Sequence, residues 1–198
     1  RGLGDVYKRQ QHTLVTRKSM NGGADLPIIC KVYTGLTKEE EAILFSKQTG
    51  VSRPLTAGAE LRAALVGKDA ESIAFLNATE STGLQLGLDS YRAPWKIICI
   101  RTAFKEYKAY GADLYKEALT MLAKGWEGDP DSLRSGILQG MVRFVALYQG
   151  EYDPERLVKR LQTIHPMTLV RDEKSLSGTV SYKYMTVSYT HLRAHETL

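Results

Sequence analysis

Polar side chains near the amino-terminal end of the chain could bind an anion. Gln11, His12 and Thr13 open a segment with the pattern of a short helix, and Arg17 follows about one turn later. The first turn of a helix has free backbone N–H groups and the positive end of the helix dipole, a combination that binds phosphate. The alternative is an ordinary polar first turn without a ligand, and the residue types alone favour that alternative.

The closing stretch of the chain holds a second group of candidate ligands. His191 and His195 stand four residues apart, a spacing that would place both on one face of a helix and suit zinc, and Glu196 follows them. A zinc site needs further ligands, and no matched pattern of histidines or carboxylates lies nearby. We therefore expect no metal site.

Both ends of the chain resemble peptides that arise when sequencing-adapter DNA is translated at the edges of metagenomic assemblies. The two stretches are RGLGDVYKRQ, residues 1–10, and VSYTHLRAHETL, residues 187–198, and the chain begins with Arg rather than Met. This resemblance implies that both stretches are non-native and should be excluded from reasoning about the fold. The native protein would then run from about Gln11 to Thr186 and be cut at both ends.

Composition places the chain among ordinary globular proteins. It has 198 residues, of which 43% are hydrophobic and 25% charged, enough for one domain or two small ones. No apolar run reaches the roughly 18 residues of a membrane helix, and no signal segment opens the chain. The net charge of +5 is a mild basic excess. Cys30 and Cys99 lie in apolar runs, which predicts buried, reduced thiols in a cytoplasmic protein.

The first fifty residues predict a helix, a strand and a second helix. The helix over 11–21 should stop at Asn21-Gly22-Gly23, and the β-branched run over 26–35 predicts a buried strand. Thr37 and Glu40 have the spacing of a capping box, so a helix should begin there and end at Gly50. One strand cannot form a sheet, so its partners must lie upstream or in segments not recognised as strands.

The rest of the chain is predicted to be helical, with breaks at proline and glycine. A weak strand or turn is expected over 84–88. Asp131 or Ser132 should cap the helix that follows Pro130, and His165-Pro166 should end the last helix. The predicted helices cover 55–66, 70–80, 95–110, 112–126, 132–148 and 154–165. Their apolar stripes predict a core that includes Leu122, Trp126, Ile137, Met141 and Val145.

Two further groupings have both a functional and a structural interpretation. Tyrosines and lysines alternate between Lys105 and Lys116, as in some single-strand binders, but tyrosines at helical spacing more often pack. Four carboxylates between Asp129 and Asp153 could suggest a metal cluster, but they follow Gly and Pro in turns, where capping explains them. No Gly-rich phosphate loop, Ser/His/Asp set or CxxC pair occurs.

The amino-terminal part resembles the ParB/sulfiredoxin-like superfamily. The resemblance rests on QHT, a short helix, NGG, and then LPIICKVYTGLTKEEEAILFSKQ, and it covers roughly 11–50. The later phrases GW-x-GDPDS and IL-x-G-x-x-x-F resemble uncharacterised ParB-like proteins of phages and mobile elements. The resemblance implies an α+β fold, mostly helical: the C-terminal part of a ParB-like domain over 11–50, followed by a helical bundle over 51–180.

The family motif transfers to this chain only in part. Gln11 and His12 match the motif's Gln and His, whereas Thr13 stands where many members have Arg. The preceding Asp and Gly of the motif have no counterpart, because Arg9 and Gln10 occupy their places. In sulfiredoxin a cysteine stands where this chain has Gln11, so sulfiredoxin chemistry is not expected.

These observations lead to two functional hypotheses. The first is a nucleic-acid- or nucleotide-associated protein of a phage or mobile element, which binds phosphate through Gln11, His12, Thr13 and Arg17. CTPase or nuclease activity is left open but not favoured, because the arginine-rich nucleotide loop of ParB proteins is absent. No cofactor is expected, with CTP left open for the full-length protein. The second hypothesis is a non-catalytic module whose helical half binds a protein partner.

Overall fold

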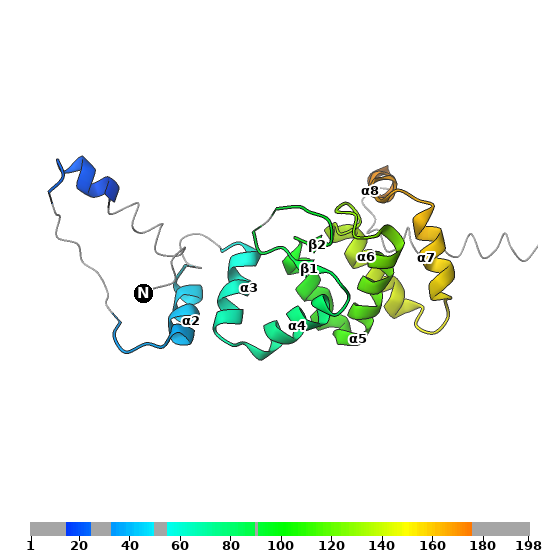
Figure 1. The fold of residues 1–198 in the computed structure, drawn as a ribbon, viewed down its shortest axis with the longest axis horizontal. Coiled ribbons are helices and arrows are strands. Elements are labelled where there is room, and N and C mark those ends of the chain that lie inside the picture. Colours follow the sequence, from blue (N-terminus) through cyan, green and yellow to red (C-terminus); the bar gives the residue numbers. More distant parts are fainter. Residues whose placement is uncertain (1–14, 25–32, 50–54, 90, 176–198) are drawn as a thin grey trace, which may run out of the picture.

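The computed structural model describes residues 15–24, 33–49, 55–89 and 91–175, and these residues are mostly helical (Figure 1). Two short strands, β1 at Gln85–Leu86 and β2 at Lys96–Ile97, pair in parallel. The helices are α2 at Lys38–Thr49, α3 at Ala57–Val66, α4 at Ala70–Glu80, α5 at Ile100–Trp126, α6 at Ser135–Leu147, α7 at Pro154–Gln162 and α8 at Pro166–Ser175. The expectation of a mostly helical fold is confirmed, and no helix in the described ranges is long and apolar enough to cross a membrane.

The longest helix, α5, lies at the centre of the fold. It packs mainly against α6 and α7 on one side and α4 on the other, and α8 contacts α6 (Figure 1). All five residues predicted for the core are buried, and Leu122, Ile137, Met141 and Val145 are fully inaccessible. Gly125 lets α7 approach closely, because a Cβ at that position would lie 2.8 Å from the Leu161 side chain.

Local sequence signals position several helix ends as predicted. The Thr37 backbone N–H donates to Glu40 Oε2 at 2.9 Å, and the Glu40 N–H donates back to Thr37 Oγ1 at 3.3 Å. This reciprocal capping box starts α2. Helices α3 and α4 occupy the predicted segments, each with a side-chain N-cap, from Thr56 and Asp69 respectively. Asp153 caps α7, and Pro154 takes its first position.

The prediction of a continuous helix over 95–110 is wrong at its start. Residues 96–97 form β2, and the helix begins only at Ile100. The reason is a turn that precedes the strand: Pro94 is followed by Trp95, which adopts a left-handed φ of 62° that no helix interior allows. The weak strand expected over 84–88 is β1, so the parallel pair comes from segments whose strand signal was faint.

Two other boundaries differ from the prediction. Helix α6 starts at Ser135 with Arg134 as N-cap, so Asp131 and Ser132 do not cap it. Asp129 instead accepts the backbone N–H of Asp131 at 2.7 Å, which forms a turn before the helix. Helix α7 ends at Gln162 with Thr163 as its C-cap, before the predicted end at His165-Pro166. Pro166 instead begins α8, a helix that was not predicted.

Glycine at position 111 divides α5 into two segments. Gly111 has φ 83° and ψ 169°, values outside the helical region. The sequence predicts separate helices up to 110 and from 112, and the structure confirms the break at this residue. Helix α4 contacts both segments, and the carboxy-terminal segment supplies most of the buried residues of α5.

The amino-terminal region is described only in pieces. Residues 15–20 form a short helix, and the Gly23 N–H donates to the Lys18 carbonyl at 2.9 Å, so Asn21-Gly22-Gly23 ends it as predicted. Residues 33–35, the end of the predicted strand over 26–35, are exposed and not in a strand. The remainder of that predicted strand lies outside the described residues, as do Cys30 and Gly50.

Candidate functional site

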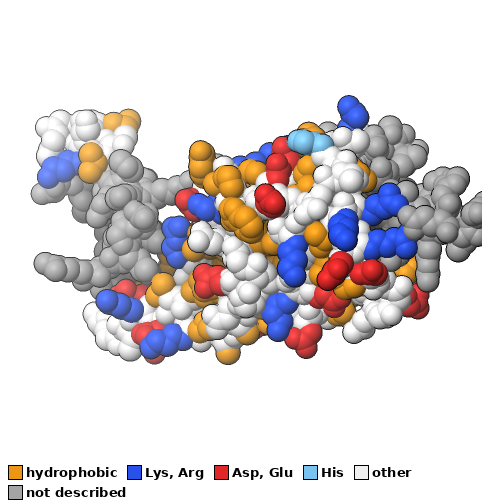
Figure 2. All heavy atoms as spheres, turned by 45° about the vertical axis from the view of Figure 1, so that its right-hand side comes forward, with side chains coloured by type: hydrophobic (Ala, Val, Ile, Leu, Met, Phe, Trp, Pro, Cys, Tyr) orange, Lys and Arg blue, Asp and Glu red, His pale blue; other side chains and the backbone are white. Residues whose placement is uncertain are grey.

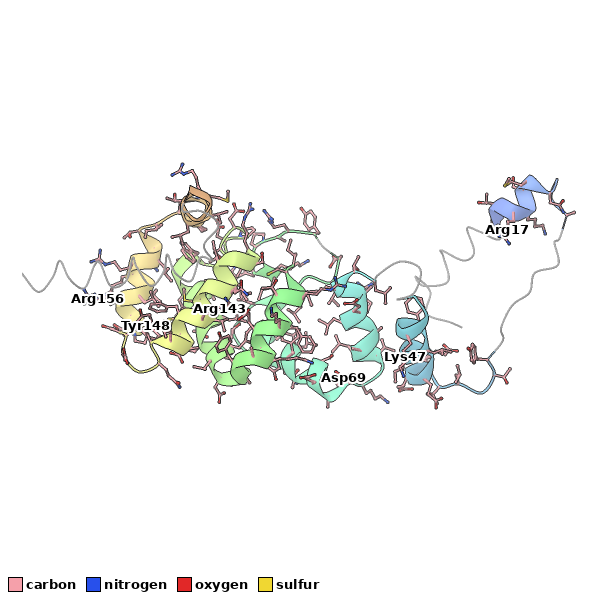
Figure 3. All side chains as sticks on the ribbon, turned by 180° about the vertical axis from the view of Figure 1, so that it is seen from behind. Arg17, Lys47, Asp69, Arg143, Tyr148 and Arg156 are labelled. Carbon is pink, nitrogen blue, oxygen red and sulfur yellow. The ribbon has the colours of Figure 1, made fainter. Side chains whose placement is uncertain are left out.

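The phosphate ligands predicted from the sequence are mostly outside the described ranges. Gln11, His12 and Thr13 precede them, so the structure does not place these side chains. Arg17 is described and exposed, on a short helix that stands apart from the helical body (Figure 3). A helix of six residues does not by itself build an anion site. The amino-terminal phosphate site therefore stays a prediction.

Some of the candidate metal ligands lie outside the described residues and others lie within them. His191, His195 and Glu196 lie outside the described residues. Within the described part of the chain, no group of three or more His, Cys, Asp or Glu side chains is placed to hold a metal ion. Asp129 and Asp153 accept backbone N–H groups at a turn and at a helix start, so the capping interpretation is confirmed for these two carboxylates. Asp131 instead accepts from arginine side chains.

Two tyrosines of α5, Tyr107 and Tyr115, belong to the packing of the fold. Tyr115 is fully buried and its hydroxyl lies 3.2 Å from Thr79 Oγ1. Phe75 contacts Tyr115, Tyr107 and Phe104 with ring centroids 4.9 to 5.8 Å apart. Burial raises the pKa of the Tyr115 phenol. Rings held in this cluster are not available to stack on a ligand, so packing accounts for Tyr107 and Tyr115, whereas Tyr110 is exposed.

A pocket of about 430 Å³ lies where the segment before α5 meets the start of α6. Two arginines, Arg92 and Arg134, line it together with the first residues of α6, Ser135 and Gly136. The other lining residues are Ile98, Cys99, Pro130, Leu133 and Val170. The pocket therefore combines polar and apolar surface, and the charged side chains that line it are both cationic.

One carboxylate holds both guanidinium groups of the pocket. Arg134 donates through Nε at 2.8 Å and approaches through Nη2 at 2.7 Å, both to Asp131 Oδ1. Arg92 donates to the same oxygen through Nη1 at 3.2 Å. These three groups together carry one net positive charge, and the Asp129 carboxylate next to them accepts the backbone N–H of Asp131. Each guanidinium has five N–H donors, so both retain donors that Asp131 does not use.

The helix dipole adds to this positive potential. Ser135 and Gly136 open α6, which is 13 residues long, and both line the pocket. The Arg134 side chain occupies the N-cap position but makes no capping hydrogen bond. The positive end of the dipole therefore lies at the pocket, alongside the two arginines. The arrangement suits a phosphate or carboxylate group.

The thiol that lines the pocket, Cys99, is unreactive at neutral pH. Cys99 is a free cysteine whose Sγ donates to the Leu133 carbonyl at 3.4 Å. Burial raises the pKa of this thiol to about 11. A thiol with that pKa stays protonated at neutral pH and is a poor nucleophile. The pocket is therefore equipped for binding and not for cysteine chemistry.

The sequence YRAPW, residues 91–95, was not recognised as functional. It carries Arg92 into the pocket and leaves the aromatic residues on either side exposed, Tyr91 by 70% and Trp95 by 42%. The sequence did contain one indication of a binding loop, an arginine between two aromatic residues next to a proline. Its partner Arg134 lies about 40 residues away, so only the fold shows that they meet.

The surface around the carboxy-terminal helices mixes charge and apolar side chains. Figure 2 shows Lys and Arg side chains on the right-hand part of the displayed face, close to acidic ones, and hydrophobic side chains grouped on its upper part. Helix α7 contributes Lys159 and Arg160 in its last turn. The described surface therefore has basic residues without forming one uniform basic face.

Comparison with known proteins gives a family but no activity. No curated protein and no solved structure matches the chain. One family model matches residues 4–195, a range that contains the described residues and most of both adapter-like ends. Since this match covers nearly the whole chain, the protein belongs to the family of unknown function DUF6551.

Proposed function

We propose that this protein binds the phosphate group of a nucleotide or nucleic acid in the pocket between Arg92 and the start of α6. The observation that carries the proposal is the meeting of Arg92 and Arg134 on Asp131, in a pocket at the positive end of a helix. Guanidinium groups fixed by a neighbouring carboxylate lose little entropy when they bind a phosphate. The net positive charge of +5 agrees with such a ligand.

The resemblance to ParB-like proteins supports the same class of ligand through a second contact. In this extended form, Gln11, His12, Thr13 and Arg17 bind another phosphate of the ligand. The protein would then act as a nucleic-acid- or nucleotide-associated protein of a phage or mobile element. The two contacts are separable, because the pocket lies in the helical body and the other residues lie near the amino terminus.

Calorimetric titration tests the pocket directly. Inorganic pyrophosphate and CTP are titrated into the protein at low and at moderate salt. We expect Arg92→Gln and Arg134→Gln each to weaken binding at least fivefold, with an unchanged far-ultraviolet circular dichroism spectrum. The matched control is Arg62→Gln, which removes the same charge from an exposed position on α3. If all three variants bind alike, the pocket is not the site.

The amino-terminal contact requires its own variant. His12→Ala in the full-length protein should weaken CTP or nucleic-acid binding without altering the fold. An unchanged affinity would remove the motif-based part of the proposal and leave the pocket in place. If the protein binds neither pyrophosphate, CTP nor nucleic acid, the alternative of a non-catalytic protein-interaction module replaces the proposed function.

A further inference from the structure

The loop that supplies Arg92 to the pocket also presents two aromatic rings to solvent. Tyr91 is 70% exposed and Trp95 is 42% exposed, one on each side of Arg92 in the sequence. Four residues of chain span at most about 14 Å, so both rings lie near the pocket. Exposed aromatic rings beside cationic groups are the two features that proteins use to bind single-stranded nucleic acid.

Contacts in the structure hold the position of Trp95. Its backbone N–H donates to the Gly128 carbonyl at 2.8 Å, and its indole lies against the backbone of Gly128. The Lys96 N–H donates to the Ala93 carbonyl at 3.3 Å and closes the turn. Trp95 occupies the turn position that favours glycine, at φ 62°. A bulky residue kept in a strained conformation is characteristic of a ligand site, and here the ring is oriented before any ligand arrives.

We propose that this surface binds single-stranded nucleic acid, with bases stacked on Tyr91 and Trp95 and a backbone phosphate in the pocket of Arg92 and Arg134. The inference rests on the proposed function, because the phosphate contact is the same, and it specifies the ligand. Stacking needs base faces that a duplex hides, and exposed rings next to guanidinium groups are the pattern of single-strand binding. The cationic pocket favours a polyanion over an apolar protein partner.

Fluorescence anisotropy tests the inference with two labelled probes. One is an oligothymidylate of about 12 nucleotides, a length within the usual site size, and the other is a duplex of the same length. We expect the single strand to bind at least tenfold more tightly than the duplex at moderate salt. Tyr91→Ala should weaken single-strand binding at least fivefold, and Tyr91→Phe should restore it, because the phenyl ring still stacks. Tyr110→Ala on α5 is the matched control, since that tyrosine is also exposed.

Tryptophan emission reports the second ring. The oligothymidylate should quench the emission of Trp95. The emission of Trp126 should not change, because Trp126 is largely buried and its Nε1 donates to the Ile164 carbonyl at 2.7 Å. Trp95→Gly removes the ring and suits the positive φ, so it should abolish quenching and weaken binding while the helical body stays folded. Circular dichroism of the variant checks that the fold is retained.

The outcomes separate this inference from the proposed function. If Arg92→Gln weakens both pyrophosphate and oligonucleotide binding but Tyr91→Ala and Trp95→Gly do not, stacking is overturned and the phosphate pocket stands. Duplex binding as tight as single-strand binding also overturns stacking. If the arginine variants leave pyrophosphate and oligonucleotide binding unchanged, both the proposed function and this inference fail.

Discussion

The indole ring of Trp95 lies against the backbone of Gly128 so closely that any side chain at position 128 would overlap it. Gly128 itself has a φ of 73°, in the region that favours glycine. The Trp95 N–H donates to the Gly128 carbonyl, so the contact is made by both backbone and ring. This pair joins the loop before β2 to the connection between α5 and α6, and thereby positions one wall of the pocket.

Gly128→Ala should destabilise the protein by about 2–4 kcal/mol, because the new Cβ meets the ring and also strains the backbone. Gly150→Ala is the control, since Gly150 has a similar φ of 75° but no atom within 4 Å of the added Cβ. It should cost about 1 kcal/mol, from backbone strain alone. Urea unfolding of the two variants measures the difference. Equal losses would show that the ring does not press on position 128.

Met141→Asp should unfold the helical body. Met141 is fully buried on α6 within the hydrophobic core, where a carboxylate has no water to stabilise it. The control is Met167→Asp on α8, where the methionine is 37% exposed and the charge can reach water. Circular dichroism at 222 nm should show lost helix only for the first variant. Retained helix content in Met141→Asp would contradict the assignment of the core.

Glu106 is a buried carboxylate between α5 and α6. Its Oε1 accepts from Gln139 Nε2 at 2.6 Å and lies 3.4 Å from Arg143 Nη2, whereas Oε2 has no hydrogen-bond partner among the described residues. Glu106→Ala should destabilise the fold by about 1–3 kcal/mol, because the Gln139 amide loses its acceptor in a half-buried position. Glu106→Gln keeps an acceptor oxygen and should cost less. Denaturant midpoints measure the stability of the two variants. A lower midpoint for Glu106→Gln than for Glu106→Ala would contradict the role assigned to Oε1.

Alkaline pH should destabilise the fold through Cys99. Burial raises the pKa of its thiol from 9.0 to about 11, so the stabilising effect of the neutral thiol is complete below pH 9 and is lost as the pH rises towards 11. The pKa of Tyr115 is also raised by burial and adds to the loss at higher pH. Unfolding free energies at pH 8 and pH 10.5 should fall less for Cys99→Ala than for the unchanged chain. An identical fall in both would remove Cys99 as a cause.

The same pKa predicts slow alkylation of the native thiol. At pH 8 about one thiol in a thousand is ionised when its pKa is near 11. In a Cys30→Ser background, iodoacetamide should therefore modify Cys99 slowly in the folded protein and rapidly after unfolding in urea. Equal rates in the two states would show that the thiol is not buried in solution.

Local signals in the sequence predicted the helical body well. The capping box of Thr37 and Glu40, the break at Gly111 and the stripe through Met141 each depend on residues close together in the chain, which is why spacing alone identifies them. Short strands are different. Two residues of β2 form a strand only because β1 lies beside them, and the left-handed turn at Trp95 contradicts the usual preference of tryptophan.

The candidate pocket was beyond prediction for a related reason. Arg92 and Arg134 have no shared motif, and each is an ordinary surface arginine until the fold brings both to Asp131. The ligands that were predicted, Gln11, His12 and Thr13, were suggested by a local pattern and a resemblance. They lie outside the described residues, so the amino-terminal site and the helical pocket have to be tested separately.

The break at Gly111 makes the longest helix tolerant of changes in length. In a continuous α-helix, one inserted residue rotates all that follows by about 100° and removes the apolar face from its partners. Gly111 is exposed, has no neighbouring atom within 4 Å of an added Cβ and is already non-helical, so a loop there can absorb the extra residue. An extra residue at this point should therefore leave both segments packed against α4 and α6, which makes Gly111 a suitable position for inserting a reporter sequence.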